Sequence, residues 1–284
     1  MTMSFIIPLK QKFSSARKEV CQKSPLIHCI THPIVINDCA NAVLALGGRP
    51  IMAEHPKEVF HIASMADALT VSLGNITDAR AQSMMIAGKQ KAAVFDLVGI
   101  TCSSFRMDLA RQFIKECPPA IIKGNASEIR AIAGCSFQDS GIDVSAKDAV
   151  TKENLSSQME MADILRHCAK HFHTVVLATG EVDMAASWES NSVYLIENGS
   201  PLMAKITGTG CMLTSIAGVY MAVSDPLTAA LLAAVTLGTA GEIAAQSKDT
   251  LGLGTYHVRL LDALSLMTDD ILFSNMKIRQ ETNF

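Results

Sequence analysis

The chain has 284 residues, of which 49% are hydrophobic, and its formal net charge at pH 7 is −3. This length and hydrophobic content allow one large core, so we expect a single domain spanning residues 1–284. The small negative charge and the 5% aromatic content argue against a nucleic-acid partner or an anionic membrane surface. Eight cysteines without a Cys-x-x-Cys pair, and a polar N-terminus, favour reduced thiols and a cytoplasmic location.

Short apolar runs alternate with amphipathic stretches along most of the chain. The apolar runs predict strands at Leu26–Thr31, Leu69–Leu73, Ala92–Val98, Ala120–Lys123 and Thr174–Ala178. The amphipathic stretches predict helices at Ile34–Leu46, Lys57–Met65, Ala79–Lys89, Phe105–Glu116, Ser127–Ala133 and Lys152–His171. Strands separated by segments of helix length are typical of βαβ units, so this order predicts an α/β fold with a mainly parallel sheet.

The later part of the chain predicts a loop, a hairpin and a long apolar helix. The polar stretch Ser136–Glu153 is typical of a surface loop. Met184–Trp188 and Ser192–Ile196 predict an antiparallel hairpin at an edge of the sheet. Leu227–Gly241 carries no charge but is short for a membrane span, and Asp225-Pro226 before it predicts an N-cap and a first helical turn. We therefore expect a buried core helix there.

The stretch Thr207-Gly-Thr-Gly210 predicts an anion site, because it runs directly into a helical pattern. Apolar residues follow it at the spacing of one buried helix face: Leu213, Ile216, Ala217 and Tyr220. A glycine loop that opens a helix leaves unpaired N–H groups at the positive end of the helix dipole, which suits a phosphate group. Cys211 lies in the first turn, beside anything bound there. A simple tight turn gives the same pattern, so this motif alone leaves phosphate binding open.

Polar residues also follow each predicted strand at its carboxyl end, where ligands bind in parallel sheets. They are Thr31-His32, Gly74-Asn75, Asp96, Lys123–Glu128 and Thr179–Glu181. Helix caps, turn glycines and a surface lysine explain each of these residues singly. Their shared position at the strand ends predicts instead that they line one cleft together with Thr207–Cys211.

Asp96 and Glu128 are candidate metal-side carboxylates in this cleft. The Mg²⁺ that accompanies a nucleoside triphosphate is usually held by one or two carboxylates, often through water. Lys123 is a candidate phosphate partner, because an ammonium group neutralises phosphate as a point charge. Glu128 has a second interpretation, since Asn125 followed three residues later by glutamate predicts a capping box. The two interpretations of Glu128 are compatible with each other.

Two other patterns are discounted. His167, Cys168, His171 and His173 are dense enough to suggest a metal site. No carboxylate or distant cysteine pair completes this set, so we expect a solvated helix end. Gly252-Leu-Gly254 resembles a dinucleotide-binding loop, but it follows a predicted helix where such a loop follows a strand.

Taken together, these motifs resemble those of the hydroxyethylthiazole kinase family of the ribokinase-like superfamily, over nearly the whole chain. The resembling segments are Pro25–Thr31, Asn41–Met52, Lys123–Ile129, Thr179–Asp183, Thr207–Cys211, Gly254–Tyr256 and Leu261–Leu264. The cysteine of Gly-Thr-Gly-Cys211 is the most specific feature, because other ribokinase-like enzymes usually carry aspartate there. The resemblance implies a ribokinase-like α/β fold with helices on both faces of a mainly parallel central sheet.

The resemblance also implies an activity. In this family ATP and Mg²⁺ are used to phosphorylate the primary alcohol of 4-methyl-5-(2-hydroxyethyl)thiazole in thiamine salvage. A homotrimer with active sites at the subunit interfaces is implied as well. Two alternatives stay open: a related kinase of another small heterocyclic alcohol such as hydroxymethylpyrimidine, and a non-catalytic member that binds the thiazole or a nucleotide.

The resemblance assigns roles to five residues of this sequence. Met52 and Gly208 are implied to contact the thiazole. Lys123 and Thr179 are implied to contact ATP. Cys211 occupies the position of the catalytic base.

Three residues are implied to lie near Mg²⁺, and the sequence departs from the family's pattern at other positions. Asn125 and Glu128 match the superfamily's Asn-x-x-Glu motif, and Asp96 is a further candidate. His32 stands where the family usually has asparagine, and the loop after Asp96 is atypical. Lys123 stands where arginine is common, which keeps the charge but loses the two-pronged geometry of a guanidinium.

Overall fold

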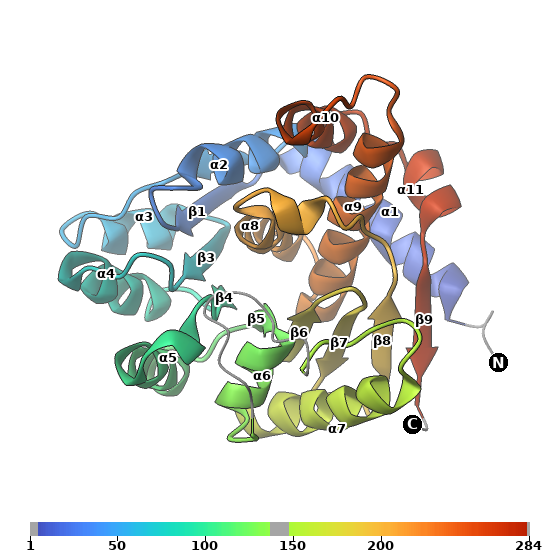
Figure 1. Cartoon of the computed structure of the whole chain (residues 1–284). Helices are drawn as coiled ribbons and strands as arrows, with labels where there is room; N and C mark the ends of the chain where they lie inside the picture. The colour runs from blue at the N-terminus through green and yellow to red at the C-terminus, as the bar shows by residue number, and fades with distance from the viewer. Residues whose placement is uncertain (1–4, 137–147, 283–284) are drawn as a thin grey trace.

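The computed structural model describes residues 5–136 and 148–282, which are built on one nine-stranded sheet (Figure 1). In the order in which they lie side by side, the strands are β2 (Arg49–Ile51), β1 (Leu26–Ile30), β3 (Ala68–Ser72), β4 (Ala93–Asp96), β5 (Ile121–Asn125), β6 (Val175–Thr179), β7 (Asp183–Ser187), β8 (Val193–Ile196) and β9 (Ile278–Glu281). Neighbours from β2 to β6 pair in parallel, and those from β6 to β9 pair antiparallel. The prediction of an α/β fold with a mainly parallel sheet is confirmed.

Helices cover both faces of this sheet (Figure 1). The apolar cluster on one face draws on α1 (Ile6–Lys23), α2 (Ile36–Ala45), α8 (Thr209–Met221), α9 (Pro226–Gln246), α10 (Leu253–Ser265) and α11 (Asp269–Asn275). The cluster on the other face draws on α3 (Val59–Met65), α4 (Asp78–Gly88), α5 (Ser104–Glu116), α6 (Ala126–Ile132) and α7 (Leu155–Phe172). The parallel strands β1, β3, β4, β5 and β6 are buried on both faces, which explains why they read as continuous apolar runs in the sequence.

Strand β6 shows how one run supplies both clusters. Val175 and Leu177 belong to the cluster on the α8 side, whereas Val176 and Ala178 belong to the cluster on the α7 side. Successive side chains of a strand point to opposite faces, so an unbroken apolar run is what a doubly covered sheet requires. Because of the same alternation, polar side chains at matching positions of neighbouring strands lie on the same face of the sheet.

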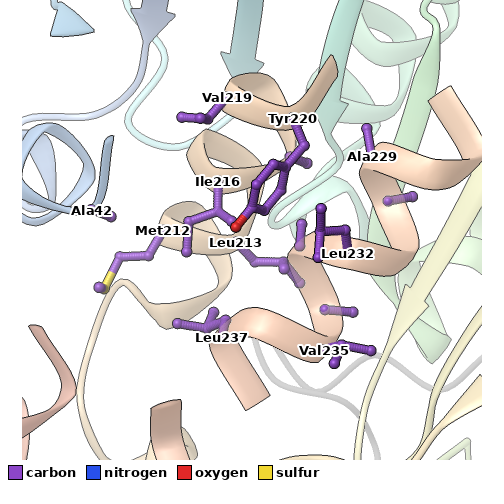
Figure 2. Packing of buried hydrophobic residues seen from close by; sticks show 14 of the residues in the cluster. Ala42, Met212, Leu213, Ile216, Val219, Tyr220, Ala229, Leu232, Val235 and Leu237 are labelled. Atoms are coloured by element: carbon purple, nitrogen blue, oxygen red, sulfur yellow. The ribbon is translucent and has the colours of Figure 1, made fainter. Parts of the chain in front are cut away.

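Helices α8 and α9 form the centre of the first cluster. Figure 2 shows Leu213, Ile216 and Tyr220 of α8 beside Leu232 of α9, while Met212 lies on the side of α8 that faces α2. Helix α8 is buried on every side from its third residue to its twelfth. The sequence predicted only one buried face, so the helix is more deeply buried than expected. A helix that is apolar all round is a core helix.

Helix α9 is the buried helix that the sequence predicts. Asp225 caps it by accepting a hydrogen bond from the Thr228 N–H, and Pro226 occupies its first turn. Among the described residues it is the one helix long and apolar enough to cross a membrane. Because 89% of its most apolar window is buried inside the protein, it serves as a core helix, as predicted.

Two parts of the chain differ from expectation or lie outside it. The β7–β8 hairpin was expected at the sheet edge, but β9 pairs with β8 and takes that edge. Its sequence Ile-Arg-Gln-Glu has no apolar alternation and is only partly buried, so no strand signal exists there. The predicted loop Ser136–Glu153 lies mostly outside the described residues, and within its described part Asp148 and Val150 are buried.

Candidate active site

The strand order creates one position where a ligand crevice is expected. From β1 the chain goes to β2 on one side and then to β3 on the other side, so a switch point lies between β1 and β3. Ligands bind beyond the carboxyl ends of parallel strands at such a point. His32 follows β1, Ser72 ends β3, and Cys211 in the first turn of α8 contacts both of them.

The loop before α8 has the conformation that a glycine allows. Gly208 is the N-cap of α8 and has φ +92°, in the left-handed region that favours glycine. A Cβ atom at this residue would lie 2.6 Å from Cγ1 of Val35, so the close contact also requires glycine. The first turn of α8 therefore presents its unpaired N–H groups at the switch point, as the sequence predicts.

Three polar residues on neighbouring strands face α8. Strand register pairs Ser72 with Asp96 and Asp96 with Lys123. Both carboxylate oxygens of Asp96 lie 3.1 Å from Nζ of Lys123, Thr214 of α8 donates to one of them at 2.9 Å, and the Val98 N–H donates to the other at 3.3 Å. These three donors make four contacts, which use the hydrogen-bonding capacity of the carboxylate.

Lys123 remains charged although it is buried. Burial is the largest single influence on the pKa of this ammonium group and lowers it. The negative charges around it, Asp96 foremost, together outweigh burial and raise the pKa above its ordinary value. A Cβ atom at Gly210 would lie 3.0 Å from Nζ, so the ammonium sits against the first turn of α8. The ammonium of Lys123 and the N-terminus of α8 thus lie together with one carboxylate. The two positive features exceed the single negative charge, so the site can bind an added anion.

Glu128 makes the capping box that the sequence predicts. The Asn125 side chain accepts from the Glu128 N–H at 2.9 Å, and Oε2 of Glu128 accepts from the Asn125 N–H at 2.7 Å. Oε1 of Glu128 accepts from the Gly99 N–H at 2.7 Å, which ties α6 to the loop after β4. Burial and the nearby Asp96 raise the pKa of Glu128 to about 7. A cation beside this carboxylate would favour its charged form.

The two carboxylates differ in their fitness to hold Mg²⁺. Among the described residues, no group of three or more His, Cys, Asp or Glu side chains is placed to hold a metal ion by itself. Mg²⁺ requires fewer protein ligands than such a group provides, because it commonly keeps several waters and binds one or two carboxylates and the substrate's phosphates. Asp96, which accepts four contacts from three donors, does not fit as a direct ligand in this arrangement. Glu128 accepts one N–H on each oxygen and keeps lone pairs for water or metal, so it fits.

Cys211 is buried and holds its proton. The residue is 6% exposed, and burial followed by the charge of Asp96 raises the pKa of its thiol to about 12. Its sulfur lies 3.4 Å from Nε2 of His32 and 3.8 Å from Oγ of Ser72. At neutral pH the group at the predicted base position is therefore a thiol in contact with an imidazole.

The residues implied to contact the thiazole lie beside Cys211, and those implied to contact ATP lie on the neighbouring strands β5 and β6. Met52 packs against Cys211 and the buried residues Val35 and Cys39 of the same chain, and Gly208 also contacts Val35. Thr179 lies at the end of β6, paired in register with the end of β5 on which Lys123 is carried. One chain thus brings together all the residues implied to contact substrates.

Sequence reasoning missed four polar residues at this site. Ser72 is hidden in an apolar run, and Thr214 is hidden in the apolar helix α8. Arg80 donates to the backbone carbonyls of Ser72, Gly74 and Asn75, and Arg106 donates to those of Leu73 and Val98. These guanidinium groups hold the loop after β3, and their contacts to backbone atoms leave no pattern in the sequence.

The discounted patterns lie elsewhere. The rings of His167 and His171 stack with centroids 5.9 Å apart at the end of α7, and no metal cluster is present among the residues that the structure describes. Gly252 and Gly254 lie at the start of α10, and the element before them is helix α9. Neither pattern contributes to the switch-point site.

Comparison with known proteins agrees with this architecture. Residues 18–270 match the model of the hydroxyethylthiazole kinase family. A Clostridium botulinum (strain Hall) protein named hydroxyethylthiazole kinase 2 is 43% identical over 267 residues, which cover 92% of this chain and 98% of that protein. A solved structure of a hydroxyethylthiazole kinase protein from Pyrococcus horikoshii OT3 has a TM-score of 0.83 and 30% identity, and covers 98% of this chain and 100% of its own.

A more distant structure shows the fold alone. The pyridoxal kinase from Staphylococcus aureus in complex with pyridoxal has a TM-score of 0.52 at 13% identity, and covers 76% of this chain and 87% of its own. It shares the arrangement of a central sheet between helices. On the strength of the family match and the two closer relatives, the chain belongs to the hydroxyethylthiazole kinase family and has a ribokinase-like α/β fold.

Proposed function

We propose that this chain transfers the γ-phosphoryl group of ATP to the primary alcohol of 4-methyl-5-(2-hydroxyethyl)thiazole, with Mg²⁺, in thiamine salvage. The observation that carries the proposal is the site at the N-terminus of α8, where Cys211 and Lys123 lie together in a chain that matches the family over residues 18–270. The names of the relatives, hydroxyethylthiazole kinase in each case, support the choice of alcohol. Eight free cysteines support a reducing, cytoplasmic setting for a single-domain enzyme.

The two sides of the site suit the two substrates. Met52, which is partly buried and packs against the buried cluster of Val35, Cys39 and Cys211, offers an apolar side chain to a small heterocycle. On the other side, the first-turn N–H groups of α8 and the ammonium of Lys123 bind the transferring phosphate, with Thr179 nearby on β6. Phosphoryl transfer passes through a loose transition state, so this chain contributes mainly positioning and charge stabilisation.

Glu128 is the residue that holds Mg²⁺ in this proposal. Its carboxylate keeps lone pairs beyond the two N–H groups that it accepts, and Asn125 fixes its position through the capping box. When bound, Mg²⁺ neutralises phosphate charge, while Asp96 acts indirectly by holding Lys123. Asn125 acts through Glu128.

The test is a mass-resolved assay of the purified protein with ATP and Mg²⁺. Hydroxyethylthiazole and hydroxymethylpyrimidine are offered separately, and we expect phosphate product from the thiazole. A folded Gly208→Val variant is the control for contaminating kinases, because a side chain at this residue collides with Val35. Product from the pyrimidine alone would favour the related kinase, and no product from a folded protein that binds the thiazole would favour a non-catalytic member.

We also propose that the enzyme is a homotrimer with sites near subunit interfaces. Large apolar side chains are exposed on the neighbouring elements α2 and α10 and beside them: Ile34 (61%), Leu44 (55%), Leu251 (89%), Leu253 (42%) and Val258 (60%). Asp38 of α2 lies 3.1 Å from His257 of α10, and Gly208 packs close to the same Asp38. An apolar surface this close to the site supports an interface with a second copy.

A further inference from the structure

His32 and Cys211 form a buried side-chain pair that the proposed function does not explain. Nε2 of His32 lies 3.4 Å from Sγ of Cys211, and the two residues are 9% and 6% exposed. They lie 179 residues apart in the sequence and meet at the switch point between β1 and β3.

The loop after β3 holds the imidazole in place. A Cβ atom at Gly74 would lie 2.1 Å from Cδ2 of His32, so the backbone of Gly74 packs directly on the ring. Arg80 fixes that backbone by donating to the carbonyl oxygens of Gly74 and Asn75. Asn75 itself has φ +44°, which marks a tight turn of this loop. The ring is thus confined from the side of β3 while its Nε2 faces the thiol.

The direction of the hydrogen bond between Cys211 and His32 depends on which ring nitrogen carries the hydrogen in the neutral ring. A thiol that donates to Nε2 leaves the hydrogen on Nδ1. Nδ1 of His32 is buried and has no hydrogen-bond partner among the residues that the structure describes. Among the described residues, Cys211 is therefore the side chain that forms a hydrogen bond with this ring.

We propose that His32 is the partner through which Cys211 works: its Nε2 accepts the thiol hydrogen and receives the proton that Cys211 takes from the alcohol. This inference rests on the proposed kinase function. In this role His32 acts through its contact with Cys211, so it is a positioning residue that also stores a proton.

The step conserves atoms and charge. The alcohol oxygen forms a bond to the γ-phosphorus while the bond from that phosphorus to its bridging oxygen breaks, which releases ADP. The hydroxyl proton passes to Sγ of Cys211, and the thiol proton of Cys211 passes to Nε2 of His32. The imidazolium then returns its proton to solvent, so both residues end as they began.

The charges that face His32 favour a neutral ring before the step. Burial lowers the pKa of His32, Arg80 of α4 and Arg106 of α5 lower it further, and Asp96 of β4 raises it. The result is a pKa below the ordinary 6.5. The imidazole is therefore free to accept a proton at neutral pH, and kcat falls when the pH drops through this pKa.

The kinetic test compares kcat against pH for wild type, His32→Asn and His32→Leu. An asparagine oxygen still accepts the thiol hydrogen but cannot keep a proton, and leucine does neither. Wild type should lose activity only at a pH below the ordinary histidine range, because the pKa of His32 is lowered, and this loss should be absent in His32→Asn. We expect kcat to fall roughly tenfold in the asparagine variant and roughly a hundredfold in the leucine variant, with the KM for ATP within about twofold of wild type.

His28→Asn is the matched control. His28 lies on β1, is fully buried, has a lowered pKa for the same reason of burial, and contacts the carbonyl oxygen of Ala53 at 2.8 Å. Loss of this ring should reduce the stability of the protein, but kcat should still fall at low pH as it does in wild type. If His32→Asn also keeps the wild-type pH profile and kcat, His32 does not take the proton and the proposal is wrong.

An NMR measurement separates this proposal from the kinase assignment. In protein labelled with ¹⁵N-histidine, the signals that disappear in His32→Asn belong to His32. Cys211→Ala should shift the Nε2 signal of His32 and leave that of His28 in place. If wild type makes no thiazole phosphate and this shift is observed, the function fails and the pairing stands. An unchanged His32 signal in Cys211→Ala would show that the pair does not exist.

Discussion

Lys123 and Asp96 form an ion pair that almost no solvent reaches. Lys123 is 5% exposed and Asp96 is fully buried, and the pair lies directly under the first turn of α8. Removing one partner from such a pair leaves an unpaired charge in the interior, whereas removing both does not. A single substitution at Lys123 would therefore lower activity for two reasons: it removes the phosphate-binding cation, and it destabilises the protein.

Lys123→Met should reduce the free energy of unfolding by about 3–5 kcal/mol, because the carboxylate of Asp96 loses its cation. The double variant Asp96→Asn with Lys123→Met removes both charges and should recover much of that loss. Urea denaturation of wild type, the single variant and the double variant measures the loss in the free energy of unfolding and its recovery. Both variants should have a low kcat, because the cation beside the phosphate is gone. A Lys123→Met protein as stable as wild type would contradict the buried-pair interpretation.

At the scale of the element, α8 joins the core to the site. Its first turn carries Cys211, and its later turns pack on β3, β4 and α9. Gly218 permits the closest approach, because a Cβ atom there would lie 2.4 Å from Cγ2 of Thr70 and 3.2 Å from Cγ2 of Ile27. The distance between α8 and β3 also determines the contact of Cys211 with Ser72 at the end of β3.

Gly218→Ala should therefore lower the free energy of unfolding by about 1–3 kcal/mol, because the added methyl group overpacks the α8–β3 interface. Gly254→Ala in α10 is the matched control, since nothing lies within 4 Å of its added methyl group. This control should stabilise the protein by roughly 0.4–1 kcal/mol through reduced freedom of the unfolded chain. Urea denaturation at one pH measures both, and equal effects would show that α8 and β3 are not closely packed at Gly218.

At the scale of the whole molecule, the apolar surface of α2 and α10 lies next to the site. Leu44 of α2 is 55% exposed and Val258 of α10 is 60% exposed, and the two helices pack against each other. Met52, Gly208 and Cys211 meet beside this surface, so an interface here would border the site.

Light scattering coupled to size exclusion should give a mass three times the 30.4 kDa of the chain. Leu44→Lys together with Val258→Lys should shift that mass to smaller species, because two ammonium groups cannot be buried without partners. Leu155→Lys on α7, which packs on the other face of the sheet, is the matched control and should keep the wild-type mass. A wild-type protein with the mass of one chain would contradict the trimer.

The sequence by itself determined those features that depend on neighbours a few residues apart. Doubly buried strands read as apolar runs, so β1, β3, β4, β5 and β6 were predicted with shifted ends. The Asn125–Glu128 capping box and the Asp225 cap of α9 were predicted for the same reason, since each joins residues three apart. The polar residues after the strands were found because parallel strands share one carboxyl edge.

Only the tertiary structure decided which of those residues meet. Thr214 reaches Asp96 across 118 residues and His32 reaches Cys211 across 179, and no local period encodes such a pair. The structure also decided that three donors occupy Asp96, that Glu128 keeps lone pairs for a metal, and that β9 takes the sheet edge. Periodicity in a sequence records whether a residue is buried, whereas its partner is set by how the helices and the sheet pack together.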